Sequence, residues 1–142
     1  MDTQLIKRLE PLVAAVAVPG GTARAIAWSE RNAAAGFPAI VLTRVTSGRD
    51  YDHEGHDGLA FPRVQFDLYH DDAVALAVLA NALIALMETQ ADVTVGGVTV
   101  RFHHGFLVDD QGPMADDLGS AGTDRRALRR MMEWQFFWEI VT

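Results

Sequence analysis

Residues 63–69 are RVQFDLY, and this stretch decides the fold. Apolar and polar residues alternate strictly along it, which is typical of a β-strand with one buried face and one polar face. Residues 72–88 follow at once and predict a helix, with Asp71 placed to cap its first turn. Apolar residues lie on more than one side of this helix. We therefore expect it to pack on a sheet on one side and on a second helix or another subunit on the other.

The segments on either side predict further strands and one more helix. Residues 39–46 are rich in β-branched side chains and predict a core strand, and a short strand is predicted near residues 24–28. Residues 93–95 and 98–100 flank Gly96 and Gly97, which predicts a hairpin whose second arm could extend to Val108. Residues 132–140 alternate again and predict a closing strand, although residues 127–132 alone would also fit a helix. Residues 3–17 predict an amphipathic helix that Pro11 kinks or splits.

Together these elements predict an α+β fold in a single domain spanning residues 1–142. We expect a mostly antiparallel β-sheet of five or six strands, including a hairpin, with two main helices packed on it. Residues 47–58 and 109–124 are rich in glycine and acidic side chains. We expect the first of these segments to be an exposed loop and the second a long mobile loop.

Composition excludes several classes of function. About half of the 142 residues (49%) are hydrophobic, so the chain can bury a core, and its net charge of -7 removes the electrostatic basis for tight binding to nucleic acid or anionic membranes. Without cysteine there is no disulfide, thiolate zinc site or cysteine nucleophile. The longest apolar run, residues 73–87, is shorter than a membrane-spanning helix requires, and the first ten residues lack the apolar segment of a signal peptide, so we expect a mature intracellular start.

The most suggestive group of metal-ligating side chains lies in residues 50–57. Its carboxylates and imidazoles could hold a divalent cation, and its opening resembles a calcium loop. Phe61, however, stands where such a loop needs a bidentate glutamate, and the flanking residues predict strands instead of helices. We therefore favour a hydrated turn. The side chains concerned are Asp50, Asp52, His53, Glu54 and His56.

Other polar groups receive a structural interpretation. His103 and His104 are adjacent, so on a strand they point to opposite faces and cannot chelate one ion. His70 and Asp71 lie at a strand-to-helix junction, where the acid serves as a cap. The basic cluster Arg125, Arg126, Arg129 and Arg130 is expected to pair with the preceding aspartates, Asp109, Asp110, Asp116, Asp117 and Asp124, or with a neighbouring subunit. We predict no catalytic, cofactor-binding or metal-ligating residue and no cofactor.

Several short strings occur in a characteristic order. FPAIV at residues 37–41 opens a strand, GLA at residues 58–60 precedes the next strand, and RVQFD at residues 63–67 lies within it. An alanine-rich helix follows, and a strand rich in aromatic residues closes the chain. Together these features resemble the tail-completion or tail-terminator proteins of long-tailed bacteriophages, prophages and gene transfer agents, and the resemblance covers most of residues 37–141. The segment from Asp109 to Asp124 departs from it.

This resemblance implies a structural subunit that forms a ring, expected to be a hexamer, on the head-proximal end of the tail tube. Its partners would be other copies of itself, the tail tube protein and the head connector or stopper protein. The protein would reside in the virion and, during assembly, in the bacterial cytoplasm. DNA would pass through the lumen without specific binding, which acidic residues lining the lumen would favour. No membrane contact is implied.

A closed ring needs two different complementary patches on each subunit. We expect them on the polar face of the strand at 63–69 and on the helix that follows. The expected interface residues are Arg63, Gln65, Asp67, Tyr69, Leu79 and Leu83. Two alternatives remain open: a head-tail connector or minor tail protein of the same particle, and a small metal-dependent enzyme that uses residues 50–57.

Overall fold

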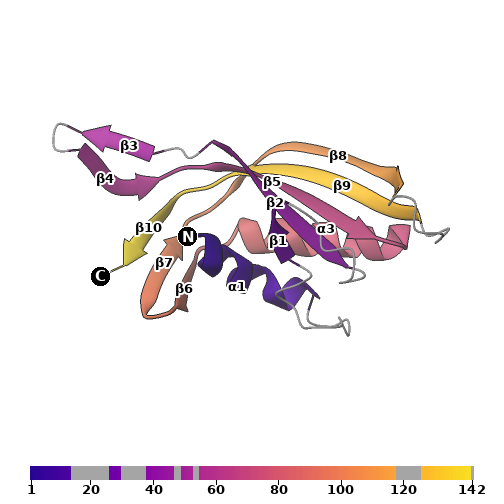
Figure 1. The fold of residues 1–142 in the computed structure, drawn as a ribbon, viewed down its shortest axis with the longest axis horizontal. Coiled ribbons are helices and arrows are strands. Elements are labelled where there is room, and N and C mark those ends of the chain that lie inside the picture. The colour runs from indigo at the N-terminus through magenta and orange to yellow at the C-terminus, as the bar shows by residue number, and fades with distance from the viewer. Residues whose placement is uncertain (14–25, 30–37, 47–48, 53–54, 118–125, 142) are drawn as a thin grey trace.

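The structure, a computed structural model, describes residues 1–13, 26–29, 38–46, 49–52, 55–117 and 126–141. These residues form two helices and two five-stranded sheets, shown in Figure 1. The α+β class is confirmed, and the strands are mostly antiparallel, as predicted. The described residues contain more strands than the five or six that the sequence predicts. Segments predicted as loops contain strands, and one predicted long strand is two separate strands.

The first sheet has the order β1-β2-β5-β9-β8. Its strands are β1 (Ile26–Trp28), β2 (Ala39–Thr46), β5 (Arg63–His70), β8 (Phe106–Asp117) and β9 (Arg126–Gln135). Only β1 and β2 pair in parallel. The predicted strand at 63–69 is therefore the central strand, and the edge strands are β1 and β8.

The second sheet is antiparallel throughout and has the order β3-β4-β10-β7-β6. Its strands are β3 (Arg49–Asp52), β4 (Gly55–Ala60), β6 (Ala91–Val95), β7 (Val98–Phe102) and β10 (Trp138–Val141). The predicted hairpin is confirmed in β6 and β7, and Gly96 and Gly97 both have the positive φ that its two-residue turn requires. Its second arm ends at Phe102, so the extension to Val108 is wrong.

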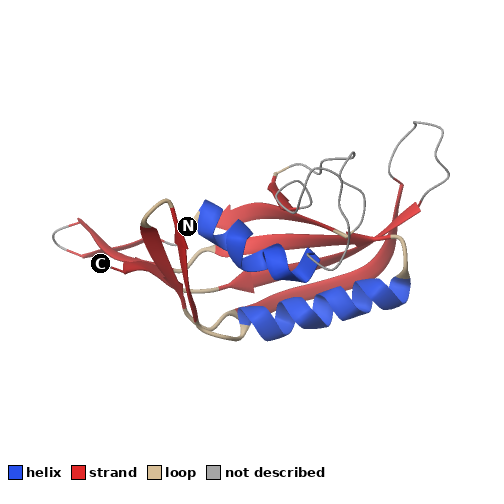
Figure 2. Ribbon diagram, turned by 90° about the horizontal axis from the view of Figure 1, so that it is seen from below, coloured by secondary structure: helices blue, strands red, loops and turns tan. Residues whose placement is uncertain are grey.

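Both helices, α1 (Asp2–Val13) and α3 (Ala73–Met87), cover the same face of the first sheet, as Figure 2 shows. Val64, Phe66 and Leu68 of β5 point to that face and are fully buried, which confirms the alternation. They join apolar residues of α1 and α3 in one core. Helix α1 continues through Pro11, so the proline does not split it, and the predicted residues 14–17 lie outside the described residues.

The cap of α3 is Asp72, not Asp71 as predicted. Asp72 has an extended backbone, and its carboxylate accepts a hydrogen bond from the backbone N–H of Ala75 at 3.2 Å. The two backbone N–H groups of Asp71 and Asp72 donate to Nδ1 of His70, at 2.9 and 3.3 Å. The histidine ring thereby orders the junction, and the cap shifts by one residue.

Two segments predicted as loops contain strands. Strands β3 and β4, which include most of the loop predicted at 47–58, form a hairpin that projects beyond the rest of the second sheet in Figure 1. Strand β4 pairs with β10 only through Leu59 and Ala60. The rest of the β3-β4 hairpin therefore needs no buried face, and its sequence shows no alternation of apolar and polar residues. Strand β8 occupies much of residues 109–124, where Gly112-Pro113 fits an irregularity between Gln111 and Met114 at the sheet edge. Residues 118–124 lie outside the described residues.

The closing strand predicted at 132–140 is two strands in different sheets. Strand β9 ends at Gln135 and β10 begins at Trp138. Residues 127–132 belong to β9, so the helical alternative is wrong. At the same level, β4 passes to β5 through Phe61 and Pro62, and β7 passes to β8 through residues 103–105. Three chain segments thus cross from one sheet to the other side by side, joined by bonds from Phe136 N–H to Pro62 O and from His103 N–H to Phe137 O.

Candidate functional site

The polar face of β5 lies on the side of the first sheet away from the helices. Directly paired residues of antiparallel strands share a face, so Arg63, Gln65, Asp67 and Tyr69 lie there with Gln135, Glu133, Met131 and Arg129 of β9. Both helices lie below the sheet in Figure 1, and the described residues place no helix on the upper side. We call this side the open sheet face. It brings together the four polar residues predicted for the interface.

Ion pairs and hydrogen bonds tie the open sheet face together. Arg63 contacts Glu133 with an N···O distance of 2.6 Å. The Asp67 carboxylate accepts from Nε of Arg129 and from Nε2 of Gln65, each at 2.9 Å, and is only 6% exposed. Because these groups already have partners within the subunit, they present a fixed pattern of charge to anything that docks on this face.

Helix α3 contains no charged residue from Ala73 to Met87. Leu79 and Leu83, which were also predicted for the interface, are buried in the core of the subunit. The large apolar side chains of α3 that are exposed are Val74, 71% exposed, and Val78, 64% exposed. They are four residues apart and lie off the buried stripe of Leu76, Leu79 and Leu83. Periodicity did not rank the faces of this helix, because Asn81 is its single polar side chain from Ala73 to Met87.

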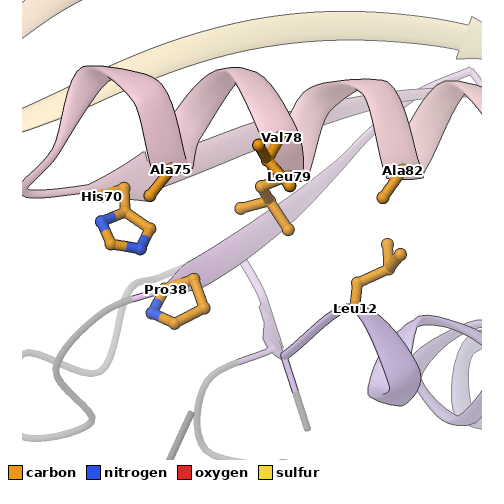
Figure 3. Close-up of a pocket in the computed structure, with 7 residues that line it drawn as sticks. All are labelled: Leu12, Pro38, His70, Ala75, Val78, Leu79 and Ala82. Atoms are coloured by element: carbon orange, nitrogen blue, oxygen red, sulfur yellow. The ribbon is translucent and has the colours of Figure 1, made fainter. Parts of the chain in front are cut away.

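A cavity of about 330 Å³ opens between the helices. Figure 3 shows Leu79 and Val78 of α3 and Leu12 of α1 at its sides, with Pro38 and His70 at one end. Ala75 and Ala82 also line it, and among the lining residues that the structure describes only His70 has a polar side chain. A site with this lining binds apolar groups. The described part of the lining brings no set of polar side chains together.

A second exposed apolar group begins β8. Phe106 is 59% exposed, and Leu107 and Val108 are also exposed. Phe106 is paired with Gln135, which is paired with Arg63, so its ring belongs to the open sheet face. These residues were not predicted to be exposed, because their positions suggested the arm of a hairpin. Three consecutive apolar residues just before an acidic stretch were the available signal.

Arg8 is a buried cation that joins α1 to the end of α3. Its Nη2 donates to the carbonyl oxygen of Leu86 at 2.7 Å and also to that of Thr89, and its guanidinium lies 5.1 Å from the centre of the Phe102 ring. Only 7% of the residue is exposed, and burial lowers the pKa of the guanidinium to about 10, so it stays charged at neutral pH. Arg8 stabilises the C-terminal end of α3, where unpaired carbonyl groups favour a cation. Its place between Leu5 and Leu9 on the buried stripe was the sequence signal.

The other predicted polar groups have separate partners. Nε2 of His103 lies 3.3 Å from a carboxylate oxygen of Glu139, whereas Nδ1 of His104 contacts the carbonyl oxygen of Glu88 at 2.6 Å, so the two histidines do not converge. Arg130 pairs with Asp110, which confirms one of the predicted contacts between the arginine cluster and the aspartates. Arg129 instead pairs with Asp67. The side chains of Arg125, Arg126, Asp116, Asp117 and Asp124 lie outside the described residues.

The predicted metal-binding alternative falls on side chains that lie outside the described residues. Of residues 50–57, only the backbone of β3 and of the start of β4 is described, and His53 and Glu54 are not. Among the side chains that the structure does describe, no group of three or more histidine or acidic residues could hold a metal ion. Neither α1 nor α3 is long and apolar enough to span a bilayer.

No family model and no curated protein matches this sequence. One solved structure is similar over 99% of this chain and 93% of its own length, with a TM-score of 0.54 and 17% sequence identity. The name of that structure states no activity, ligand or partner. At this identity the similarity shows a shared fold and nothing about function.

Proposed function

We propose that this chain is a structural subunit of the tail-terminator type. It would form a ring, expected to have six copies, at the head-proximal end of a phage or gene-transfer-agent tail. There it would end growth of the tail tube and join the tail to the head, through contacts with the tube protein and with the head connector or stopper protein.

One observation supports this proposal most strongly: exposed apolar side chains occur on two opposite layers of the subunit. Val74 and Val78 lie on the helix layer, whereas Phe106 lies on the open sheet face. Exposed apolar patches on a folded domain commonly mark protein interfaces. Two different patches, one on each side, are what a head-to-tail ring requires, because each copy then contacts its two neighbours through different surfaces.

The resemblance of residues 37–41, 58–60 and 63–67 to tail-terminator proteins supplies the place of this ring in the particle. The net charge of -7 suits a channel through which DNA passes without binding. An assembly role needs neither a catalytic residue nor a cofactor.

The experiment is tube capping followed by electron microscopy. Tail tubes are grown from purified tube protein, this protein is added, and more tube protein is then supplied. We expect a cap at one end of each tube and no further growth there. The variant Val74→Asp should cap poorly, because it places a charge on the exposed helix surface, whereas Val98→Asp on the β6-β7 hairpin should cap normally.

Tubes that bear no cap and keep growing would refute the terminator role. If the protein instead bound the head connector while tubes grew freely, it would belong to the connector or minor tail proteins of the same particle.

A further inference from the structure

Histidine rings contact the backbone at both ends of α3. His70 precedes the helix, and its Nδ1 accepts hydrogen bonds from the backbone N–H groups of Asp71 and Asp72 at 2.9 and 3.3 Å. His104 lies at the other end, where its Nδ1 is 2.6 Å from the carbonyl oxygen of Glu88, the residue that caps α3. The same ring atom therefore meets donors at one end of the helix and an acceptor at the other.

We infer that these two contacts form a pH-sensitive device in which acidification releases the backbone at the start of α3 and keeps the contact at its end. The inference is independent of the proposed function. It follows from which ring nitrogen carries a proton, because a protonated nitrogen donates a hydrogen bond and an unprotonated one accepts.

Nδ1 of His70 lacks a proton in this arrangement. Two backbone N–H groups share its lone pair, so the neutral ring carries its proton on Nε2. Histidine is the side chain that gains a second proton between about pH 8 and about pH 5. In His70 that proton goes to Nδ1, and the ring then no longer accepts from Asp71 and Asp72.

The carboxylate of Asp71 accepts from the protonated ring. Its Oδ1 lies 2.9 Å from Nδ1 of His70. An unprotonated Nδ1 forms no hydrogen bond with this oxygen, because both atoms are acceptors, whereas a protonated Nδ1 forms an ion pair with it. Protonation therefore exchanges two bonds to the backbone for one bond to a side chain. The released backbone directly precedes Val74, which is 71% exposed, so the change occurs beside the exposed apolar surface of α3.

The contact at the end of α3 has the opposite requirement. A carbonyl oxygen only accepts, so Nδ1 of His104 already carries a proton. A second proton goes to Nε2 and leaves the bond to Glu88 in place. A cation at the C-terminal end also interacts favourably with the helix dipole, as the guanidinium of Arg8 does there, whereas a cation at the N-terminal end opposes it.

The described residues around His70 leave the Asp71 carboxylate as the one placed at Nδ1. Helix α3 contains no charged residue, and Leu12 and Pro38 face the ring across the cavity in Figure 3. On β9, two residues beyond the partner of His70, Arg130 is bonded to Asp110. The described charged groups on the surrounding elements are Asp71, Asp72, Arg130 and Asp110 for His70, and Glu88 and Arg8 for His104.

Nuclear magnetic resonance of the isotope-labelled full chain tests the assignment of the ring protons. At about pH 8, where histidine is neutral, the ring nitrogen resonances distinguish a protonated Nδ1 from an unprotonated one. We expect an unprotonated Nδ1 in His70 and a protonated Nδ1 in His104. A neutral His70 with its proton on Nδ1 would overturn the inference.

The backbone amides report the release. As pH falls from about 8 to about 5, the amide proton resonances of Asp71 and Asp72 should shift upfield together with the titration of the His70 ring, because their hydrogen bonds are lost. The amide of Ala75 is the internal control and should keep its position, since its acceptor is the Asp72 carboxylate and not the ring. Amides of Asp71 and Asp72 that do not shift over this range would overturn the inference.

Matched variants identify the responsible ring. In His70→Asn the side-chain oxygen accepts at the position of Nδ1 and does not titrate, so the amides of Asp71 and Asp72 should no longer respond to pH. His104→Asn is the control and should retain the full shift at both amides. The same shift in His70→Asn as in the natural chain would assign the change to another group and overturn the inference. Where a variant fails to fold, the ring assignment in the natural chain still decides it.

Discussion

Replacing Arg8 with methionine should lower the free energy of unfolding by about 2 kcal/mol. Arg8 donates two hydrogen bonds from Nη2 to the carbonyl oxygens of Leu86 and Thr89, which close the end of α3. Methionine preserves an unbranched apolar side chain of similar reach, so the packing of the stem is largely retained. The substitution therefore isolates the guanidinium.

The magnitude follows from opposing contributions. Two hydrogen bonds from a charged donor contribute roughly 3 to 6 kcal/mol together, and the guanidinium over the Phe102 ring adds about 0.5 to 2 kcal/mol. Against them stands the desolvation of a cation that is 7% exposed and whose Nε and Nη1 have no hydrogen-bond partner. Removing that charge recovers several kcal/mol. The stabilisation from the hydrogen bonds should exceed the desolvation cost by about 2 kcal/mol, because the bonds also satisfy carbonyl groups that methionine would leave unpaired.

Urea unfolding of both proteins, compared at equal m-values, measures this difference. For a chain of this length the midpoint of thermal unfolding should fall by about 6 °C. Lys7→Met is the matched control: Lys7 lies one residue earlier on α1, is exposed and makes a single bond to the carbonyl oxygen of Thr94, so the loss should stay below about 1 kcal/mol. An Arg8→Met protein as stable as the natural chain, or more stable, would show that desolvation outweighs the bonds and would refute this reasoning.

Three further changes test the packing and the charges. Gly105→Ala should lower the free energy of unfolding by about 1 to 3 kcal/mol in urea, because the new Cβ would lie 2.9 Å from the backbone oxygen of Met87 and 3.1 Å from the Trp134 ring. A loss near zero would mean that the backbone at the junction between α3 and β8 can shift to accommodate the new methyl group. Asp67→Ala should cost about 2 kcal/mol, since it removes a buried carboxylate that accepts hydrogen bonds from both Arg129 and Gln65. Asp92→Ala, at an exposed pair with Arg101, should have little effect, and equal losses would contradict the role of burial. Hydrogen bonds from Arg130 lower the pKa of Asp110 below 3.8. The stability that the Asp110 carboxylate contributes is therefore present above its unfolded pKa and is lost as pH falls through its folded pKa. The difference in unfolding free energy between the natural chain and Asp110→Asn should shrink below about pH 4, and a difference that grows on acidification would contradict this.

Periodicity predicted the elements that carry one buried face. Residues 63–69 alternate because β5 is central and faces the helices on one side only, so its pattern specified strand, face and core residues together. The β6-β7 hairpin was predicted for a similar reason, since Gly96 and Gly97 meet the backbone demand of its turn. Elements without a buried face escaped: the outer part of the β3-β4 hairpin and the edge strand β8 owe their form to backbone pairing, which leaves no alternation in the side chains.

The candidate site was predictable only in part. The polar face of β5 followed from alternation, and Arg63, Gln65, Asp67 and Tyr69 do share one face. Helix α3 gave no such guide, because its single polar side chain is Asn81, and whether Leu79 or Val78 is buried depends on where the sheet lies. Phe106 lies on the open sheet face because it pairs with Gln135, a residue far from it in the sequence. Tertiary position, not local pattern, decides which apolar side chains remain exposed.

The crossing between the two sheets explains why one long strand was predicted at 132–140, and it carries a last prediction. Strand β9 ends at Gln135 and β10 begins at Trp138, so two residues intervene, and an even number preserves the alternation across the break. Phe136 is fully buried there with its ring 6.0 Å from that of Phe102, whereas Phe137 is half-buried, 5.6 Å from Phe61. Phe136→Ala should cost about 3 to 5 kcal/mol in urea unfolding and Phe137→Ala less than half of that, because only the first leaves a cavity where the sheets join. Equal losses of unfolding free energy would mean that Phe137 stabilises the contact between the two sheets as much as Phe136 does. The core would then extend across both sides of the crossing.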